Sequence, residues 1–407
     1  MNRYKSIILL SYLGCLFVGI AVSSCSSRQA ASCFQQITLR HTTGFPSEEP
    51  GIEQGVSACY AGVVKGRLLL AGGCNFPEIP AAEGGKKRYY RGIYAADITA
   101  DSALTWRKAG ELPSAAAYGV SIVTPQGLIC VGGNHENGAL SSVFRLSLSA
   151  DLQSVQIDTL PSLPFTMDNS SGALVGHSLY MAGGNVDGKP SNAVLTLDLE
   201  HLENGWQRLA DFPGPPRVQP VCVGQAAEGT SPRLYLWGGF AAASDDRPAS
   251  LSTNGYCYSA TTKQWQPVAA PVRADSTEVS LGGGVGIALN DSLILCTGGV
   301  NKDIFLSALQ REALMKQAVK ADRQQVADSL KAAGKEYMLW PAEKYGFNDR
   351  LLLYNTHRDT WKEVKQAHEF ARAGAAIAGS DRTFFIINGE LKPGIRTPEI
   401  TKLNIQP

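Results

Sequence analysis

The sequence predicts an all-β fold, a β-propeller of six blades, from three observations. First, short apolar runs that end in a glycine pair recur at intervals of roughly 50 to 60 residues, which indicates a repeat architecture. Second, 42 glycines and 21 prolines among 407 residues indicate many tight turns. Third, 44% of the residues are hydrophobic and 18% are charged, which is ample for a folded core. A β-sandwich, the simpler alternative, does not explain the regular spacing of the glycine pairs.

The first 24 residues predict a signal peptide. Arg3 and Lys5 precede an apolar run at 7–22 that is short for a membrane-spanning helix. Small residues then lead to Cys25, in a pattern that resembles a bacterial lipoprotein box, where the cysteine is lipidated after cleavage. We therefore expect an exported protein, either periplasmic or held at the bacterial envelope by a lipid anchor at Cys25. The alternative is an ordinary signal peptide cleaved near the same place.

Six repeat units follow, and we expect residues 34–407 to form a single propeller. Each unit is marked by an apolar strand that ends in a glycine pair or a degenerate copy of it, at 68–73, 128–133, 179–184, 234–239, 293–299 and 384–389. Four units continue into a later strand that carries a tryptophan, namely Trp106, Trp206, Trp265 and Trp361. This pattern resembles the Kelch repeat, in which each repeat forms one four-stranded blade.

The last repeat ends one strand short of a complete blade. Residues 36–40 near the N-terminus read QITLR, a pattern typical of an extended strand. Pairing this segment with the last blade supplies the missing outer strand and removes an open sheet edge. We therefore expect the N-terminal strand to close the ring.

The fifth repeat carries an insertion, which we place at 303–345. Residues 304–335 are rich in Ala, Leu, Gln, Lys and Glu, their apolar positions recur at helical spacing, and the segment contains no proline. We expect one or two amphipathic helices between the second and third strands of this blade. They form a wall or lid over the central site, or else a solvated decoration or a contact in a homodimer.

Charge and residue inventory argue against several functions. Lys and Arg number 37 and Asp and Glu number 36, so the net charge of +1 gives no basis for a nucleic-acid partner. The six histidines and nine cysteines show no metal-ligand spacing, so we expect no metal. The cysteines within the repeats are expected to be buried apolar residues rather than disulfides. The sequence contains neither a nucleophile elbow nor a phosphate loop, and no cofactor is expected.

Polar residues beside the glycine pairs and before the innermost strands are the first candidates for a site. In a propeller these loops gather at one mouth of the central channel, where binding residues concentrate. The expected substrate-binding residues from these loops are Asn75, Asn134, Asn185, Asn301 and Arg217, with Tyr118, Asp168 and Arg372 nearby in the pattern. Such a ring of amides, carboxylates and guanidinium groups suits a polyhydroxylated acidic ligand. The alternative is that these residues only form turns, which favour Asn and Asp.

The most specific motif is NGELKPGIRT at 388–397. Its Pro-Gly turn folds the chain back, so Glu390 and Arg396 can face one pocket from opposite arms, with Lys392 near the turn. The cations lower the pKa of Glu390, whereas burial in a pocket raises it, and the sequence does not decide between the two effects. The alternative role of Glu390 and Arg396 is an ion pair that only fixes the turn.

This motif resembles the signature of the bacterial N-acetylneuraminate epimerases, periplasmic Kelch propellers also called sialic acid mutarotases. Four further stretches agree with the family, namely AGGCNFP at 71–77, GELP at 110–113, AYGVS at 117–121 and GGVNKDIF at 298–305. The family's Glu/Arg motif lies mid-chain, whereas here it lies near the C-terminus. The sequence therefore resembles a cyclically permuted branch of the family.

The resemblance implies an isomerase that interconverts the α and β anomers of N-acetylneuraminate, an acidic sugar, by general acid/base ring opening without a metal or cofactor. Glu390 matches the family's proposed base, and Arg396 matches its partner, whose guanidinium fork suits the sugar's carboxylate. Lys392 falls in the same motif and is expected to bind substrate. The acid that protonates the ring oxygen is open among bound water, Tyr118 and His135. The alternative function is a non-catalytic propeller lipoprotein that binds a glycan or a protein partner.

Overall fold

The computed structural model describes residues 36–99, 103–226, 231–380 and 382–406. The expected signal peptide at 1–24 and the expected lipidation site Cys25 lie outside these residues. Within the described ranges, none of the helices combines the length and the apolar content that a membrane crossing requires.

The all-β class predicted from the sequence is confirmed. The described residues include six four-stranded antiparallel sheets; in five of them the strands follow chain order from the inside outward, and in the sixth the outer strand is β1. The first three sheets are β2 (Tyr60–Val64), β3 (Arg67–Ala71), β6 (Gly92–Asp97) and β7 (Trp106–Glu111); β8 (Val120–Thr124), β9 (Gly127–Val131), β12 (Val143–Leu148) and β13 (Val155–Thr159); and β15 (Ser171–Val175), β16 (Ser178–Ala182), β19 (Val194–Asp198) and β20 (Gln207–Arg208). The other three are β21 (Val221–Gln225), β22 (Arg233–Trp237), β25 (Gly255–Ser259) and β26 (Gln264–Val268); β27 (Val285–Ala288), β28 (Leu293–Thr297), β29 (Arg350–Asn355) and β30 (Thr360–Gln366); and β31 (Ala376–Ser380), β32 (Thr383–Ile387), β35 (Ile400–Gln406) and β1 (Gln36–His41).

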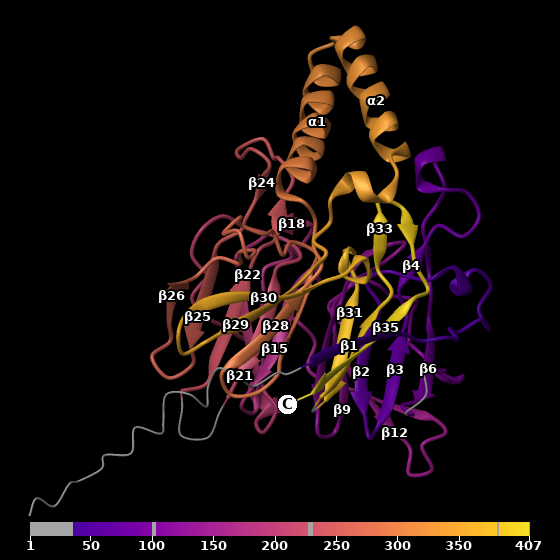
Figure 1. Cartoon of the computed structure of the whole chain (residues 1–407), viewed down its shortest axis with the longest axis vertical. Coiled ribbons are helices and arrows are strands. Elements are labelled where there is room, and N and C mark those ends of the chain that lie inside the picture. Colours follow the sequence, from indigo (N-terminus) through magenta and orange to yellow (C-terminus); the bar gives the residue numbers. More distant parts are fainter. Residues whose placement is uncertain (1–35, 100–102, 227–230, 381, 407) are drawn as a thin grey trace, which may run out of the picture.

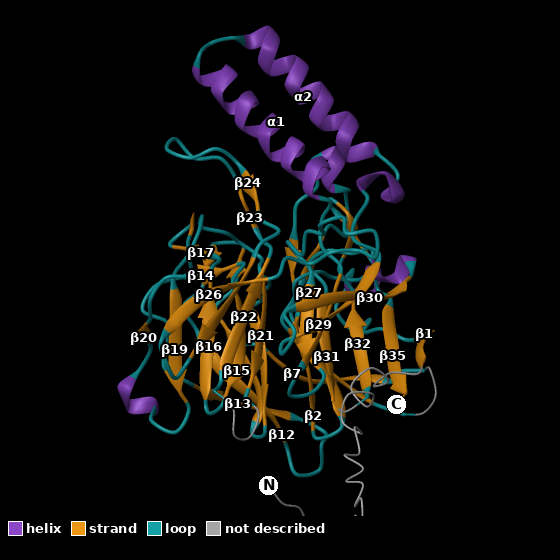
Figure 2. Cartoon of the chain, turned by 60° about the vertical axis from the view of Figure 1, so that its left-hand side comes forward, coloured by secondary structure: helices purple, strands orange, loops and turns teal. Residues whose placement is uncertain are grey.

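The six sheets are arranged in a ring as the blades of a propeller, which Figures 1 and 2 show from the side. Each innermost strand contacts the innermost strand of the next blade, and the circuit closes between β31 and β2. The apolar core lies between neighbouring blades, where the second strands contribute fully buried side chains such as Leu69, Leu179 and Ile386. Each second strand is nearly all apolar because both of its faces are buried.

The N-terminal strand β1 is the outer strand of the last blade. It pairs antiparallel with β35 along its whole length, from Gln36 opposite Gln406 to His41 opposite Thr401. The last blade thus combines strands from the N-terminus and the C-terminus, which closes the ring, and β35 is paired on both sides.

A closed ring of six backbone hydrogen bonds surrounds the channel just before the innermost strands. In each bond the amide of one residue donates to the carbonyl oxygen of the equivalent residue in the preceding blade, at 2.7 to 2.9 Å. The six residues are Ala58, Tyr118, Asn169, Gln219, Gly283 and Gly374. All six have φ between 49° and 75°, a left-handed conformation that is uncommon for residues other than glycine. The ring therefore holds the backbone at this mouth of the channel in one conformation.

Short hairpins connect the second and third strands of five blades and rise above this mouth. They are β4 (Cys74–Asn75) with β5 (Arg88–Tyr89), β10 (Asn134–His135) with β11 (Gly138–Ala139), β17 (Asn185–Val186) with β18 (Lys189–Pro190), β23 (Phe240–Ala241) with β24 (Ser250–Leu251), and β33 (Glu390–Lys392) with β34 (Ile395–Arg396). A further short strand, β14 (Met167–Asp168), pairs with β17. Short 3₁₀ turns complete the links at Ile52–Gln54, Ala81–Glu83, Leu202–Asn204 and His368–Phe370.

In the fifth blade this connection is a helical hairpin instead. Helix α1 (Lys302–Lys320) and helix α2 (Gln324–Leu339) lie between β28 and β29 and project from the mouth, followed by a 3₁₀ turn at Ala342–Tyr345 (Figures 1 and 2). The base of the hairpin is an apolar cluster that includes Tyr337, Tyr345 and Phe347. Phe305 of α1 packs edge-on against Phe240 of the fourth blade, with 4.8 Å between ring centroids. The insertion is thus packed against the propeller through aromatic side chains at its base.

Candidate active site

Glu390 and Arg396 face each other across the two arms of the β33–β34 hairpin. The two residues are directly paired in the register of the hairpin. Nη2 of Arg396 lies 2.5 Å from Oε1 of Glu390, and 25% of the Glu390 side chain is exposed against 2% for Arg396. The Pro-Gly turn recognised in the sequence therefore places the carboxylate toward the mouth and the guanidinium beneath it.

Besides the ion pair with Glu390, two contacts fix the buried guanidinium of Arg396. Its Nε donates to Oγ of Ser57 at 3.0 Å, and the guanidinium stacks 5.0 Å from the ring centre of Phe76. The remaining nitrogen, Nη1, is buried and has no hydrogen-bond partner among the described residues. Because a buried guanidinium donor without a partner is costly, Nη1 marks a place where an anionic ligand oxygen fits.

The pKa values of this pair reflect both burial and charge. Burial raises the pKa of Glu390 above its ordinary value, although the cations Arg396 and Lys87 oppose the rise. Burial lowers the pKa of Arg396, but Glu390 and Tyr118 together favour the charged form and the net shift is upward. At Glu390 the effect of burial on the pKa therefore outweighs the effect of the cations. The carboxylate is a stronger base than an exposed glutamate.

Tyr118 and Lys87 complete the charged cluster at the mouth. Nζ of Lys87 donates to the Tyr118 hydroxyl at 3.0 Å and lies 4.6 Å from the centre of its ring. Burial raises the pKa of Tyr118 well above its ordinary value, Cys74 and Glu390 add to the rise, and Arg396 opposes it. The last blade thus supplies a carboxylate and a guanidinium, the first blade an ammonium group, and the segment that leads into the second blade a phenol.

A second polar cluster forms around Asp168 from the second and third blades. Oδ2 of Asp168 accepts from Nδ2 of Asn134 at 2.8 Å, and Oδ1 accepts from Nδ2 of Asn185 at 2.7 Å and Nδ2 of Asn169 at 2.9 Å. Gln219 extends the cluster by donating to Oδ1 of Asn169 at 2.7 Å. The predicted residues Asn134 and Asn185 are therefore brought together, with their amide groups held by one carboxylate.

Two predicted binding residues are instead buried supports of the fold. Asn75 is 2% exposed; its Nδ2 donates to the carbonyls of Gly51 and Gly55, and its Oδ1 accepts from Tyr90. Arg217 is fully buried, and its Nη1 donates to the carbonyl of Gly238 at 3.0 Å.

The same supporting role recurs at the equivalent arginine of another blade. Arg372 occupies the equivalent place two blades later and donates in the same way to the carbonyl of Asn388 at 3.1 Å, and it is 1% exposed. An arginine before the innermost strand therefore satisfies the carbonyl of the left-handed residue that ends the second strand. We assign Arg217 and Asn75 to the fold rather than to the site.

Asn301 and Lys392 hold the helical insertion. Asn301 is the N-cap of α1, where its Oδ1 accepts from the amides of Asp303 and Ile304. Lys392 donates to the carbonyl of Trp340 at 2.8 Å, just after α2 ends. These two residues were expected to bind substrate, and the structure gives both of them contacts with the insertion instead.

The insertion forms a wall beside Glu390. The side chain of Tyr337 in α2 is close enough that the charge of Glu390 contributes to its pKa, which burial chiefly raises to about 12. The turn at Gly394 lies against Ala81 of the first blade. The candidate site is therefore bounded by the insertion on one side and the β4–β5 connection on the other.

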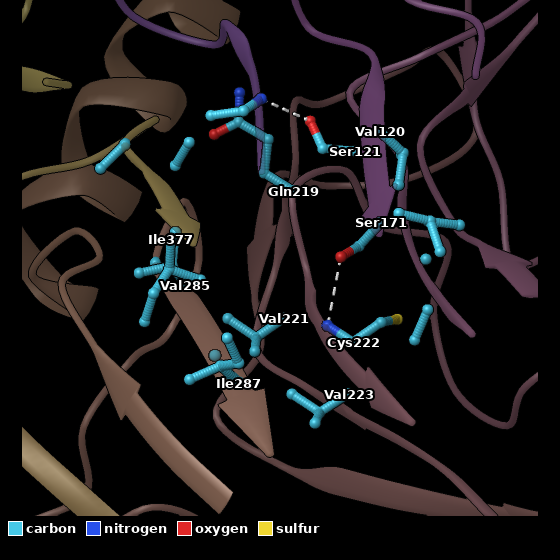
Figure 3. Close-up of a pocket in the computed structure, with 18 of the residues that line it drawn as sticks. Val120, Ser121, Ser171, Gln219, Val221, Cys222, Val223, Val285, Ile287 and Ile377 are labelled. Atoms are coloured by element: carbon cyan, nitrogen blue, oxygen red, sulfur yellow. Dashed lines mark hydrogen bonds between the residues drawn. The ribbon is translucent and has the colours of Figure 1, made fainter. Parts of the chain in front are cut away.

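The central channel below the site is apolar. It encloses a cavity of about 370 Å³ whose polar rim includes Tyr118, Asn169 and Gln219. Figure 3 shows Val221, Val285, Ile287 and Ile377 converging on the deeper part, while Ser171 turns its hydroxyl to the amide of Cys222. Ionisable side chains are thus concentrated at the mouth and not along the channel, which favours chemistry at the mouth.

A polar groove adjoins the site at its outer edge. It has a volume of about 490 Å³ and lies between the first two blades, with Lys87, Tyr89, His135 and Glu136 among its lining residues. His135 accepts from the amide of Asn137 through Nδ1 at 2.9 Å, so its ring fixes a turn. The groove gives an acidic ligand a route past Lys87 to the ion pair.

Two features of the structure escaped the sequence analysis. Lys87 and Ser57 belong to no recognisable motif. Only the folded ring brings Ser57 of the first blade to Arg396 of the last, and Lys87 to Tyr118 at the start of the second. Outside this site, His41, His368 and Glu369 place three potential metal-ligand atoms within 4.8 Å of one another at the seam of the ring. His41 is remote in sequence from His368 and Glu369, so spacing could not reveal this group. Each histidine pairs with Glu369 at 3.2 Å.

The fold and this cluster together define a β-propeller with a candidate acid/base site at the mouth of its channel. Residues 21–157 and 160–407 match the family model of N-acetylneuraminate epimerase. The chain therefore belongs to the N-acetylneuraminate epimerase family.

Individual relatives match part of the chain. The N-acetylneuraminate epimerase of Salmonella paratyphi B is 30% identical over 242 residues, which cover 60% of this chain and 57% of the relative. That of Yersinia enterocolitica is 31% identical over 269 residues, covering 64% of this chain and 61% of the relative. The chain thus spans less than two thirds of the length of either relative. The solved structure of YjhT aligns with a TM-score of 0.50 and 26% identity, over 61% of this chain and 64% of that chain.

Proposed function

We propose that this protein is a mutarotase that interconverts the α and β anomers of N-acetylneuraminate. The observation that carries the proposal is the buried guanidinium of Arg396, whose Nη1 has no hydrogen-bond partner within the described part of the chain and lies beside the partly exposed carboxylate of Glu390. The pair supplies what the reaction needs, a cation for the sugar's carboxylate and a base for its anomeric hydroxyl. Membership of the N-acetylneuraminate epimerase family supports the same reading.

In this mechanism Arg396 orients the substrate and Glu390 moves a proton. The guanidinium binds the sugar's carboxylate through Nη1, which places the neighbouring anomeric hydroxyl next to Glu390. The Glu390 carboxylate takes the proton of that hydroxyl as the ring opens, and returns it when the ring closes on the other face. Because burial raises the pKa of Glu390, that pKa moves toward neutral pH, and a general base is most effective when its pKa is near the working pH.

The polar cluster around Asp168 suits the rest of the sugar. Oδ1 of Asn134 is buried without a partner among the described residues, so it is an acceptor available to a hydroxyl or amide of the ligand. Asn134 and Asn185 keep their place in the proposal, because Asp168 orients them. Asn75, Asn301, Arg217 and Lys392 do not act on substrate in this proposal.

We further propose that the protein works outside the cytoplasm, in the periplasm or anchored at the envelope through Cys25. The basic residues and apolar run of the first 24 residues support this location. Metabolic labelling with a radioactive fatty acid tests the anchor, since Cys25→Ala removes the label from a lipoprotein and leaves an ordinary secreted protein unaffected.

The experiment that tests the activity follows freshly released α-N-acetylneuraminate by proton NMR. We expect the wild-type protein to accelerate conversion to the β anomer, and we expect Glu390→Gln to lose this acceleration. Glu203→Gln, which alters an exposed carboxylate paired with His201 in the third blade, is the matched control and keeps the wild-type rate.

The alternative function, a propeller that binds a glycan without catalysis, predicts a different result. Such a protein binds the sugar in a calorimetric titration, yet the anomers interconvert at the rate of the buffer. Acceleration that survives in Glu390→Gln retains the enzyme and removes Glu390 as its base.

A further inference from the structure

Tyr118 and Lys87 lie at the same mouth as the Glu390–Arg396 ion pair, and neither takes part in the proton transfer proposed for Glu390. Tyr118 lies on the rim of the channel and its hydroxyl meets Nζ of Lys87 at 3.0 Å. Ring opening needs a second group, since the ring oxygen must gain a proton while the anomeric hydroxyl loses one.

We propose that Tyr118 is the acid that protonates the ring oxygen, and that Lys87 positions its hydroxyl and stabilises the phenolate that forms. The proposal rests on the proposed mutarotase function and assigns the second half of its proton transfer. In it Tyr118 is a catalytic residue and Lys87 a positioning residue.

The direction of the hydrogen bond supports this role. An ammonium group has three donors and no acceptor, so the oxygen of Tyr118 accepts from Lys87. The hydrogen of the hydroxyl is then free to point elsewhere, and a phenol can donate it to a substrate oxygen at the mouth. A cation beside the phenol also favours the phenolate once the proton has left.

The backbone of Tyr118 is fixed on both sides. Its amide donates to the carbonyl of Ala58 at 2.9 Å, and its carbonyl accepts from the amide of Asn169 at 2.8 Å. Its φ of 60° is uncommon for an aromatic residue and is held by these two bonds of the ring around the channel. A side chain that starts from a rigid backbone keeps its hydroxyl near one position, as acid catalysis requires.

Charge couples the tyrosine to the ion pair. Burial raises the pKa of Tyr118, and the charges of Cys74 and Glu390 act in the same direction. Tyr118 in turn favours the charged form of Arg396, so the three groups are close neighbours in the same site. At neutral pH Tyr118 is therefore protonated, which is the state that an acid needs.

The proton transfers balance without a cofactor. The anomeric hydroxyl gives its proton to the Glu390 carboxylate, the bond between the anomeric carbon and the ring oxygen breaks, and its electron pair stays on the ring oxygen. The ring oxygen takes the Tyr118 proton, leaving an open-chain ketone, a protonated Glu390 and a phenolate beside Lys87. Rotation about the bond next to the carbonyl carbon presents its other face, and the reverse transfers close the ring as the other anomer.

The test compares anomer conversion by NMR in variants that retain their thermal unfolding midpoint. Tyr118→Phe removes only the hydroxyl, and we expect its rate above buffer to fall roughly 100-fold, the usual contribution of a general acid. Tyr256→Phe is the matched control, because that hydroxyl lies on the fourth blade, where it accepts from Asn254, and it keeps the wild-type rate. Lys87→Met lowers the rate, and Lys87→Arg restores most of it because the cation remains.

The outcomes separate this proposal from the function on which it rests. If Glu390→Gln is inactive but Tyr118→Phe converts the anomers like wild type, the mutarotase stands and Tyr118 is not its acid. If Lys87→Arg is as slow as Lys87→Met, the charge of Lys87 has no part in the reaction and its positioning role is lost. A wild-type protein that never exceeds the buffer rate overturns both proposals.

Discussion

At the scale of single residues, the site depends on how Glu390 is tuned. Arg396 lies 2.5 Å away and lowers the pKa of the carboxyl, yet burial outweighs the cation and the net shift is upward. A stronger cation effect would make Glu390 a weaker base, whereas burial without Arg396 would raise the pKa of Glu390 further. The ion pair therefore stabilises the turn and also helps to set the basicity of the Glu390 carboxylate.

Removal of Arg396 is predicted to raise the pKa of Glu390 further. In Arg396→Gln the largest opposing charge is gone, whereas burial still raises the pKa of Glu390 and Lys87 still lowers it. Because Glu390 must be ionised to act as a base, the rise of activity with pH moves to higher pH in the variant.

A carbon-13 NMR titration of the Glu390 carboxyl checks this prediction without relying on activity. The Glu390→Gln protein identifies the signal. Arg208→Gln, which disturbs an exposed pair with Asp211 in the third blade, is the control and leaves the titration in place. A titration midpoint that stays or falls in Arg396→Gln would mean that the ion pair does not govern this carboxyl.

Residue types alone did not separate binding side chains from supporting ones. Arg217 and Arg396 each keep one buried guanidinium nitrogen without a hydrogen-bond partner among the described residues, yet Arg217 bonds the carbonyl of Gly238 whereas Arg396 pairs with the partly exposed Glu390. The difference depends on which blade each side chain enters, and this is a property of packing. The motif around Glu390 could be recognised because its turn and its charges are contiguous in sequence, whereas Lys87 reaches Tyr118 only in the folded ring.

At the scale of elements, the blades differ most in the connection between their second and third strands. Five blades connect their second and third strands by a two-stranded hairpin, and the fifth uses α1 and α2. The glycine pairs, the insertion and the N-terminal strand could be predicted, because each has its own local periodicity or turn signal. Apart from β33–β34, whose Pro-Gly turn is visible in the sequence, the short hairpins could not be predicted, since runs of two or three residues carry no period.

Loss of the Lys392 contact is predicted to loosen the base of the insertion. The ammonium of Lys392 bonds the Trp340 carbonyl at 2.8 Å, and such a bond is worth about 1 kcal/mol when it is partly exposed. In Lys392→Met, hydrogen exchange of the amides at 337–345 is expected to speed up about fivefold, with the global unfolding midpoint little changed. Lys335→Met on the exposed side of α2 is the control. Equal exchange in both variants would show that Lys392 does not secure the wall.

At the scale of the whole molecule, two kinds of closure hold the site together. The six backbone bonds around the mouth join every blade to the next, and β1 joins the two ends of the chain in one sheet. The site draws Glu390 and Arg396 from the last blade and Lys87 and Tyr118 from the first part of the ring. Its geometry therefore depends on the seam between the first and last blades.

Weakening β1 is predicted to open the last blade, which forms one side of this seam, before the rest of the propeller. Ile37 and Leu39 lie on one face of the strand and pack against the core between the fifth and sixth blades. Replacing both by alanine costs about 2 kcal/mol, less than for fully buried positions because both are partly exposed. The midpoint of urea unfolding falls accordingly, and amide exchange rises first in β1 and β35. Thr38→Ala, on the opposite face, is the control. Uniform exchange across all six blades would show instead that the ring unfolds as one unit and that the seam is no weaker than any other junction.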